Sequence, residues 1–127
     1  MKEISGDIEY KGKTYKLIFN LNVMEQIQEE FGSLDKWGEL TDGASGEVDV
    51  KAVKFGFMAM INEGIDILND ERGEEVEKPF TLKQIGRMLT EIGIAQATQK
   101  VNETVVASTE SGEDRKNESS KTKLTQS

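Results

Sequence analysis

The chain contains no histidine and no cysteine, and it has a single proline. Without cysteine there is no disulfide framework, no thiolate nucleophile and no cysteine-based zinc site. Without histidine there is no Ser-His-Asp or Cys-His catalytic machinery and no imidazole metal ligand. These absences favour a binding protein over an enzyme, and we expect no catalytic residues, no metal and no cofactor.

The sequence also lacks a surplus of basic side chains. Its 127 residues include 24 acidic and 16 basic ones, which gives a formal net charge of −8. Nucleic-acid binding needs a basic surface that displaces counterions, so this balance argues against a nucleic-acid partner. No apolar run approaches the roughly 18–20 residues that cross a membrane, and no signal-peptide core follows the first residues. We therefore expect a cytoplasmic protein that does not bind membranes.

Composition divides the chain near residue 107. Residues 108–127 are almost all polar or charged, and Leu124 is their only large apolar residue. Such a segment cannot bury enough apolar surface to offset the entropy lost on ordering. The sequence therefore predicts one folded domain over residues 1–107 and a disordered polar tail over residues 108–127.

Two runs of alternating apolar and polar residues flank the dipeptide Lys11-Gly12 and predict a β-hairpin. A two-residue turn at this dipeptide gives the following pairs: Tyr10 with Lys13, Glu9 with Thr14, Ile8 with Tyr15, Asp7 with Lys16, Gly6 with Leu17, and Ile4 with Phe19. This register gathers the apolar side chains on one face, whereas a slip of one residue would scatter them over both faces.

Five later stretches have the apolar spacing of helices, over about residues 22–31, 34–40, 50–68, 82–92 and 94–107. Asn22 with Glu25 fits a capping box for the first, and Thr81 with Gln84 fits one for the fourth. The predicted fold class is α+β, mainly α. An N-terminal β-hairpin packs on a small helical domain of four to five helices, with the disordered tail after them.

The candidate partner-binding residues lie on the long helix and on the hairpin. Phe55, Met58 and Ile65 widen the apolar surface of the long helix beyond one stripe, so this helix is either the central core element or meets a partner. Two strands leave unpaired backbone groups at their outer edges, so Thr14 is a candidate for pairing with a second copy or with a partner strand.

Four segments carry a resemblance to a known family. They are GKTYKL at 12–17, FNLN at 19–22, EEFGSL at 29–34 and FTLKQIG at 80–86. In this order, over roughly residues 3–105, the sequence resembles the tail assembly chaperones of long-tailed bacteriophages and prophages, especially those of Gram-positive hosts. The motifs consist of glycines, caps and apolar positions and include no catalytic signature.

The resemblance implies a function. Such chaperones are made in the infected cell, bind the tape measure protein, and keep it soluble until tail tube subunits polymerise around it. They are generally absent from the finished virion. The resemblance implies the tape measure protein as partner, with the tail tube protein and a second copy of the chain as further candidates. It also implies that this chain could be the shorter product of a frameshifted pair.

Two other functions compete with this one. An acidic DNA mimic, or another small inhibitor or adaptor, would use the net charge of −8 to occupy a basic cleft. A mimic requires carboxylates spaced like phosphates, whereas the acids here cluster in loops and at helix starts. An enzyme that uses carboxylates alone requires a carboxyl group in an apolar pocket, but the paired acids, such as Glu74 and Glu75, lie in polar runs.

Overall fold

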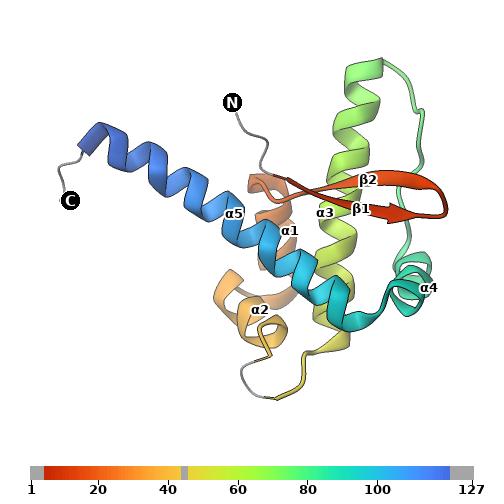
Figure 1. Cartoon of the computed structure of the whole chain (residues 1–127), viewed down its shortest axis with the longest axis horizontal. Helices are drawn as coiled ribbons and strands as arrows, with labels where there is room; N and C mark the ends of the chain where they lie inside the picture. Colours follow the sequence, from red (N-terminus) through yellow and green to blue (C-terminus); the bar gives the residue numbers. More distant parts are fainter. Residues whose placement is uncertain (1–4, 44–45, 121–127) are drawn as a thin grey trace.

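The structure is a computed structural model that describes residues 5–43 and 46–120. An antiparallel hairpin of two strands comes first and helices follow it (Figure 1). The elements are β1 (Ser5–Tyr10), β2 (Lys13–Ile18), α1 (Leu21–Phe31), α2 (Leu34–Thr41), α3 (Val50–Arg72), α4 (Leu82–Ile92) and α5 (Ile94–Ser120). This arrangement confirms the predicted α+β, mainly α, fold class.

The hairpin has the predicted register. Tyr10 pairs with Lys13, and the pairing continues to Ser5 with Ile18. The predicted partner of Phe19, Ile4, lies outside the described residues. Lys11 and Gly12 both have positive φ, 53° and 79°, as a two-residue turn requires when it follows the right-handed twist of the strands. Ile8 and Leu17 on one face of the hairpin are buried in the core, whereas the side chains of Asp7, Glu9, Thr14 and Lys16 on the other face are exposed to solvent.

The long helix α3 is the central element of the core. It contacts β2, α1, α2, α4 and α5 (Figure 1). The fully or almost fully buried side chains of α3 are Ala52, Val53, Phe57, Ala59, Met60, Ile61 and Ile65. Of the two interpretations of this helix, its apolar surface supports the core role. It begins after Asp49, whose side chain accepts from the amide of Ala52, and ends at the left-handed Gly73.

Two glycines allow α3 to approach its neighbours closely. A Cβ atom on Gly64 would overlap the backbone carbonyl oxygen of Lys16 in β2, and one on Gly56 would overlap the indole ring of Trp37. The carbonyl is part of the strand backbone and cannot rotate away as a flexible side chain would. The absence of a side chain at residue 64 therefore fixes how close the hairpin lies to α3.

Gly64→Ala should lower the free energy of unfolding by about 1–3 kcal/mol, as overpacking of a close contact does. The matched control is Gly38→Ala, because Gly38 also lies in a helix but has no neighbouring atom within 4 Å of an added Cβ. That control should gain roughly 0.5–1 kcal/mol from helix propensity. Urea unfolding followed by circular dichroism measures both, and two variants of equal stability would contradict the close approach.

The helix boundaries differ from the sequence predictions at the start of α1 and at the end of α3. The N-cap of α1 is Asn20, whose side chain accepts from the amide of Val23, so the capping box predicted at Asn22 is wrong. Asn20 and Asn22 instead both donate to the carboxylate of Glu63 on α3, at 2.8 and 3.1 Å. The helix predicted to end near Leu68 continues to Arg72.

The last helix is also longer than predicted. We expected it to end near Ala107, but α5 continues to Ser120, so residues 108–120 of the predicted tail are helical. Ala97 and Val101 are fully buried, and the hydroxyl of Ser108 donates to the carbonyl of Phe19 at 3.2 Å. Glu, Lys and Arg have favourable helix propensities, and a helix that has already formed extends at low cost. Residues 121–127 of the tail lie outside the described residues.

Candidate functional site

Two asparagines of α3 hold the loop between α3 and α4, residues 73–81. The side-chain amide of Asn69 donates to the carbonyl of Glu77 at 2.9 Å, and its oxygen accepts from the amides of Val76 and Glu77. Asn62 exchanges two hydrogen bonds with the backbone of Phe80, at 2.9 and 2.8 Å. Because the two asparagines are seven residues apart, they lie on the same face of the helix.

Glu77 connects this loop to the tip of the hairpin. Its carboxylate accepts from Nζ of Lys13 at 2.9 and 2.6 Å and from the hydroxyl of Tyr15 at 3.3 Å. The ring of Tyr15 also packs edge to face on Phe80, with 5.4 Å between ring centroids. The hairpin, the loop and α3 therefore meet around Tyr15, and the cavities described below adjoin it.

The contact changes the acid–base properties of both hairpin residues. The hydrogen bond from Lys13 to Glu77, and then the negative charge of Glu77, raise the pKa of Lys13 above 10.5. Burial, and then the charge of Glu77, raise the pKa of Tyr15 above 10.0. Tyr15 therefore stays neutral, and its hydroxyl acts as a donor to Glu77.

Glu77→Gln should lower the free energy of unfolding only slightly near neutral pH, since most of the Lys13 side chain is exposed and solvent screens the ion pair. The folded-state pKa of Lys13 is above its unfolded value, so the stabilisation is complete below the unfolded pKa and is lost as pH rises through the folded one. The stability gap between wild type and variant should therefore close above about pH 10.5. Urea titrations at about pH 8 and pH 11 test this, and an unchanged gap at the higher pH would contradict it.

A groove lies between the outer edge of β2 and α3. It has a volume of about 330 Å³, and its walls include Thr14 together with the apolar Ile65, Leu68 and Val76. Along a strand of an antiparallel pair, the backbone groups of successive residues point alternately toward the partner strand and away from it. Lys13 is hydrogen-bonded to Tyr10 at the turn, so the backbone amide of the next residue, Thr14, points away from β1. The edge is therefore open at Thr14, whereas Gly64 covers it at Lys16.

The structure brings together two of the four predicted partner-binding residues. Thr14 and Ile65 line the same groove, although the Ile65 side chain is only 3% exposed. Phe55 packs on Phe31 of α1, with 5.6 Å between ring centroids, and Met58 packs against the core. Phe55 and Met58 do not line this groove.

Sequence reasoning missed the side chains that shape this region. Residues 69–78 are rich in charged side chains and include a glycine, a composition typical of a flexible loop, yet Asn69 and Glu77 lie within them and both make defined contacts. The one available indication is the pair Asn62 and Asn69, which are about two helical turns apart in the sequence. It indicates a polar attachment point but does not identify what is attached.

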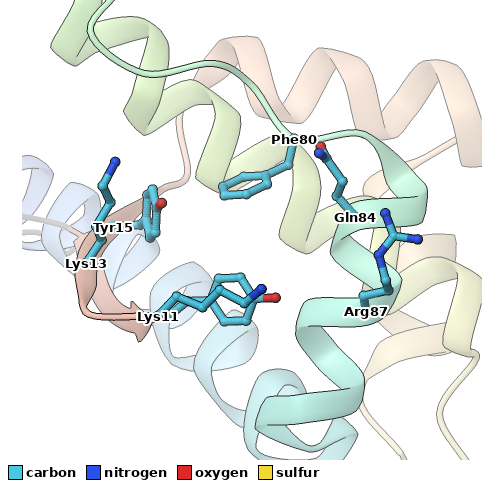
Figure 2. Close-up of a pocket in the computed structure, with 7 residues that line it drawn as sticks. Lys11, Lys13, Tyr15, Phe80, Gln84 and Arg87 are labelled. Atoms are coloured by element: carbon cyan, nitrogen blue, oxygen red, sulfur yellow. The ribbon is translucent and has the colours of Figure 1, made fainter.

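A second cavity lies on the other side of Tyr15, between the hairpin tip and α4 (Figure 2). Its volume is about 400 Å³, and its lining residues are Tyr10, Lys11, Lys13, Tyr15, Phe80, Gln84 and Arg87. Figure 2 shows Lys11, Lys13 and Tyr15 on the hairpin side and Phe80, Gln84 and Arg87 on the opposite side. Aromatic rings and cations therefore surround one space.

Neither cavity has the chemistry of a metal site. Within residues 5–43 and 46–120, no three Asp or Glu side chains lie close enough together to hold a metal ion. Over the same residues, none of the helices has the length and hydrophobicity of a membrane span.

No protein-family model matches the sequence, and neither the curated proteins nor the solved structures contain a match to it.

Proposed function

We propose that the chain is a non-catalytic tail assembly chaperone that binds the tape measure protein and keeps it soluble during tail morphogenesis. The order of the four motif segments, 12–17, 19–22, 29–34 and 80–86, supports the proposal. So does the groove beside β2, which offers a protein partner both a backbone edge and an apolar wall. As such a chaperone, the chain acts in the cytoplasm of the host cell and is not part of the finished virion.

The observation that carries the proposal is the open edge at Thr14 next to Leu68 and Val76. An extended segment can form main-chain hydrogen bonds at such an edge while an apolar side chain enters the neighbouring groove. Val76 is 40% exposed, so its side chain can contact a partner that enters the groove. A tape measure protein exposes hydrophobic surface before assembly, and this groove would cover one such side chain.

Co-expression tests the proposal. The full chain is produced together with the tape measure protein encoded in the same genome, and the soluble fraction of the tape measure protein is measured with and without it. We expect a clear increase in soluble tape measure protein and co-purification of the two chains. Unchanged solubility without co-purification would refute the chaperone function.

A pair of variants locates the contact. Val76→Asp puts a charge into the groove, and Val50→Asp puts the same charge on α3 outside it, at a side chain that is 57% exposed. Because both side chains are partly exposed, both variants should fold. Only Val76→Asp should reduce co-purification, and an equal effect of the two substitutions would exclude the groove. A second copy of the chain is the other possible occupant, and sedimentation of the free protein would detect it.

A further inference from the structure

The cavity between the hairpin tip and α4 has a charge opposite to that of the whole chain. Lys11, Lys13 and Arg87 line it and no acidic side chain does, although the chain as a whole carries a net charge of −8. Glu77 accepts a hydrogen bond from Lys13 but is not among the residues that line the cavity. The local field therefore favours an anionic group in a molecule that otherwise repels anions.

Two of the polar side chains in the lining have donors that remain available. Within the described part of the chain, the guanidinium of Arg87 makes no hydrogen bond or ion pair, and Figure 2 shows it across the cavity from Tyr15. Gln84 uses its oxygen to accept from the backbone amide of Thr81, which leaves the NH₂ group of its side chain as a donor. A planar guanidinium that has no partner is suited to a bidentate contact with a carboxylate.

The capping box of α4 uses two of the backbone amides at the start of the helix. The hydroxyl of Thr81 accepts from the amide of Gln84, and the side-chain oxygen of Gln84 accepts from the amide of Thr81. Phosphate bound at a helix start uses such backbone amides, whereas the donors considered in this cavity belong to side chains. A polyanion such as a nucleic acid would also meet the net negative charge of the surrounding protein.

Aromatic rings form the rest of the wall. Tyr10, Tyr15 and Phe80 line the cavity, and Nζ of Lys11 lies 5.4 Å from the centroid of the Tyr10 ring. A site with both rings and cations matches a ligand with an apolar body next to a carboxylate. The volume of about 400 Å³ is at the lower end for ligand pockets, which suits one or two amino-acid side chains.

We propose that this cavity binds an acidic side chain of a protein partner, Asp or Glu, together with an adjacent apolar side chain. The carboxylate pairs with Arg87, and Lys11 supplies a second positive charge. The rings of Tyr15 and Phe80 pack on the apolar neighbour. This inference rests on the proposed function for the identity of the partner, since it specifies what part of that partner the chaperone recognises.

The test uses the full chain and a defined probe, an N-acetylated, C-amidated hexapeptide of alternating glutamate and leucine. The control probes are the same peptide with glutamine in place of glutamate, and inorganic phosphate. Binding is followed by NMR through the chemical shifts of Tyr10, Tyr15 and the Arg87 side chain. The glutamate peptide should shift these resonances, and the glutamine peptide should bind at least about tenfold more weakly.

Substitutions of Arg87 distinguish a specific contact with its guanidinium from a general effect of positive charge. Arg87→Gln should weaken binding of the glutamate peptide about tenfold, Arg87→Lys should be intermediate, and Lys36→Gln on the exposed surface of α2 should change nothing. Equal binding of the two peptides would overturn the inference. So would wild-type affinity in Arg87→Gln, or inorganic phosphate that shifts the same resonances as strongly as the peptide does.

The two proposals fail in different ways. If Arg87→Gln co-purifies with the tape measure protein as well as wild type does, the acidic-residue inference fails and the chaperone function stands. If wild type does not co-purify with that protein at all, the chaperone function fails, and the peptide titration still decides what the cavity binds.

Discussion

Trp37→Ala should lower the free energy of unfolding by about 3–5 kcal/mol, the usual cost of removing a large buried aromatic side chain. Trp37 is only 3% exposed, and its indole nitrogen donates to the carbonyl of Ala52 at 2.9 Å. The indole ring also lies against Gly56, where α3 has no side chain to relax into the space left behind. The substitution therefore leaves a cavity and removes a hydrogen bond.

Circular dichroism in urea is the appropriate measurement, because Trp37 is the only tryptophan and its removal abolishes the tryptophan fluorescence. Leu21→Ala is the control, since the side chain of Leu21 is 78% exposed. It should change the stability by no more than about 0.5 kcal/mol. If the two variants unfolded at the same urea concentration, the packing of α2 on α3 would be refuted.

Leu89→Ala should cost about 2–5 kcal/mol, since truncating a buried leucine removes apolar contacts and leaves a cavity. Leu89 is 3% exposed on α4, beside the fully buried Ile85 and Met88. Because α4 contacts both α3 and α5, the loss should destabilise the whole domain in one cooperative step.

Glu74→Ala is the matched control for this substitution. Glu74 is exposed in the loop that precedes α4, and its replacement should stay within about ±0.5 kcal/mol. The thermal midpoint of Leu89→Ala should fall clearly below that of Glu74→Ala. Indistinguishable thermal midpoints would mean that α4 does not belong to the core.

Local rules predicted much of the fold. The register of the hairpin depends on the alternation around Lys11-Gly12, and the capping box of α4 depends on Thr81 and Gln84, so both could be read from neighbouring residues. The predictions failed where distant contacts decide the structure. Asn20 caps α1 while donating to Glu63, 43 residues further along the chain, and no local pattern distinguishes it from Asn22.

The candidate site was predictable only in part. The open edge at Thr14 follows from the pairing of only two strands. The position of Ile65 on the apolar surface of the long helix follows from helical spacing. Their common groove required α3 to cross the hairpin at Gly64, which depends on tertiary packing. The cationic cavity was not predicted at all, because Lys11 and Arg87 are far apart in the sequence and only the folded chain brings them to one space.

The placement of the hairpin on α3 and α5 also has a consequence for protein synthesis. The ribosome makes Ile8, Leu17 and Phe19 first, but the helices that cover this hairpin follow much later in the chain. At roughly 5–20 residues per second, Val101 of α5 is made about 4–16 s after Phe19. During that interval the nascent hairpin, which is marginally stable alone, has no complete surface to pack on. Its final docking therefore follows the synthesis of α5, which closes over Gly6.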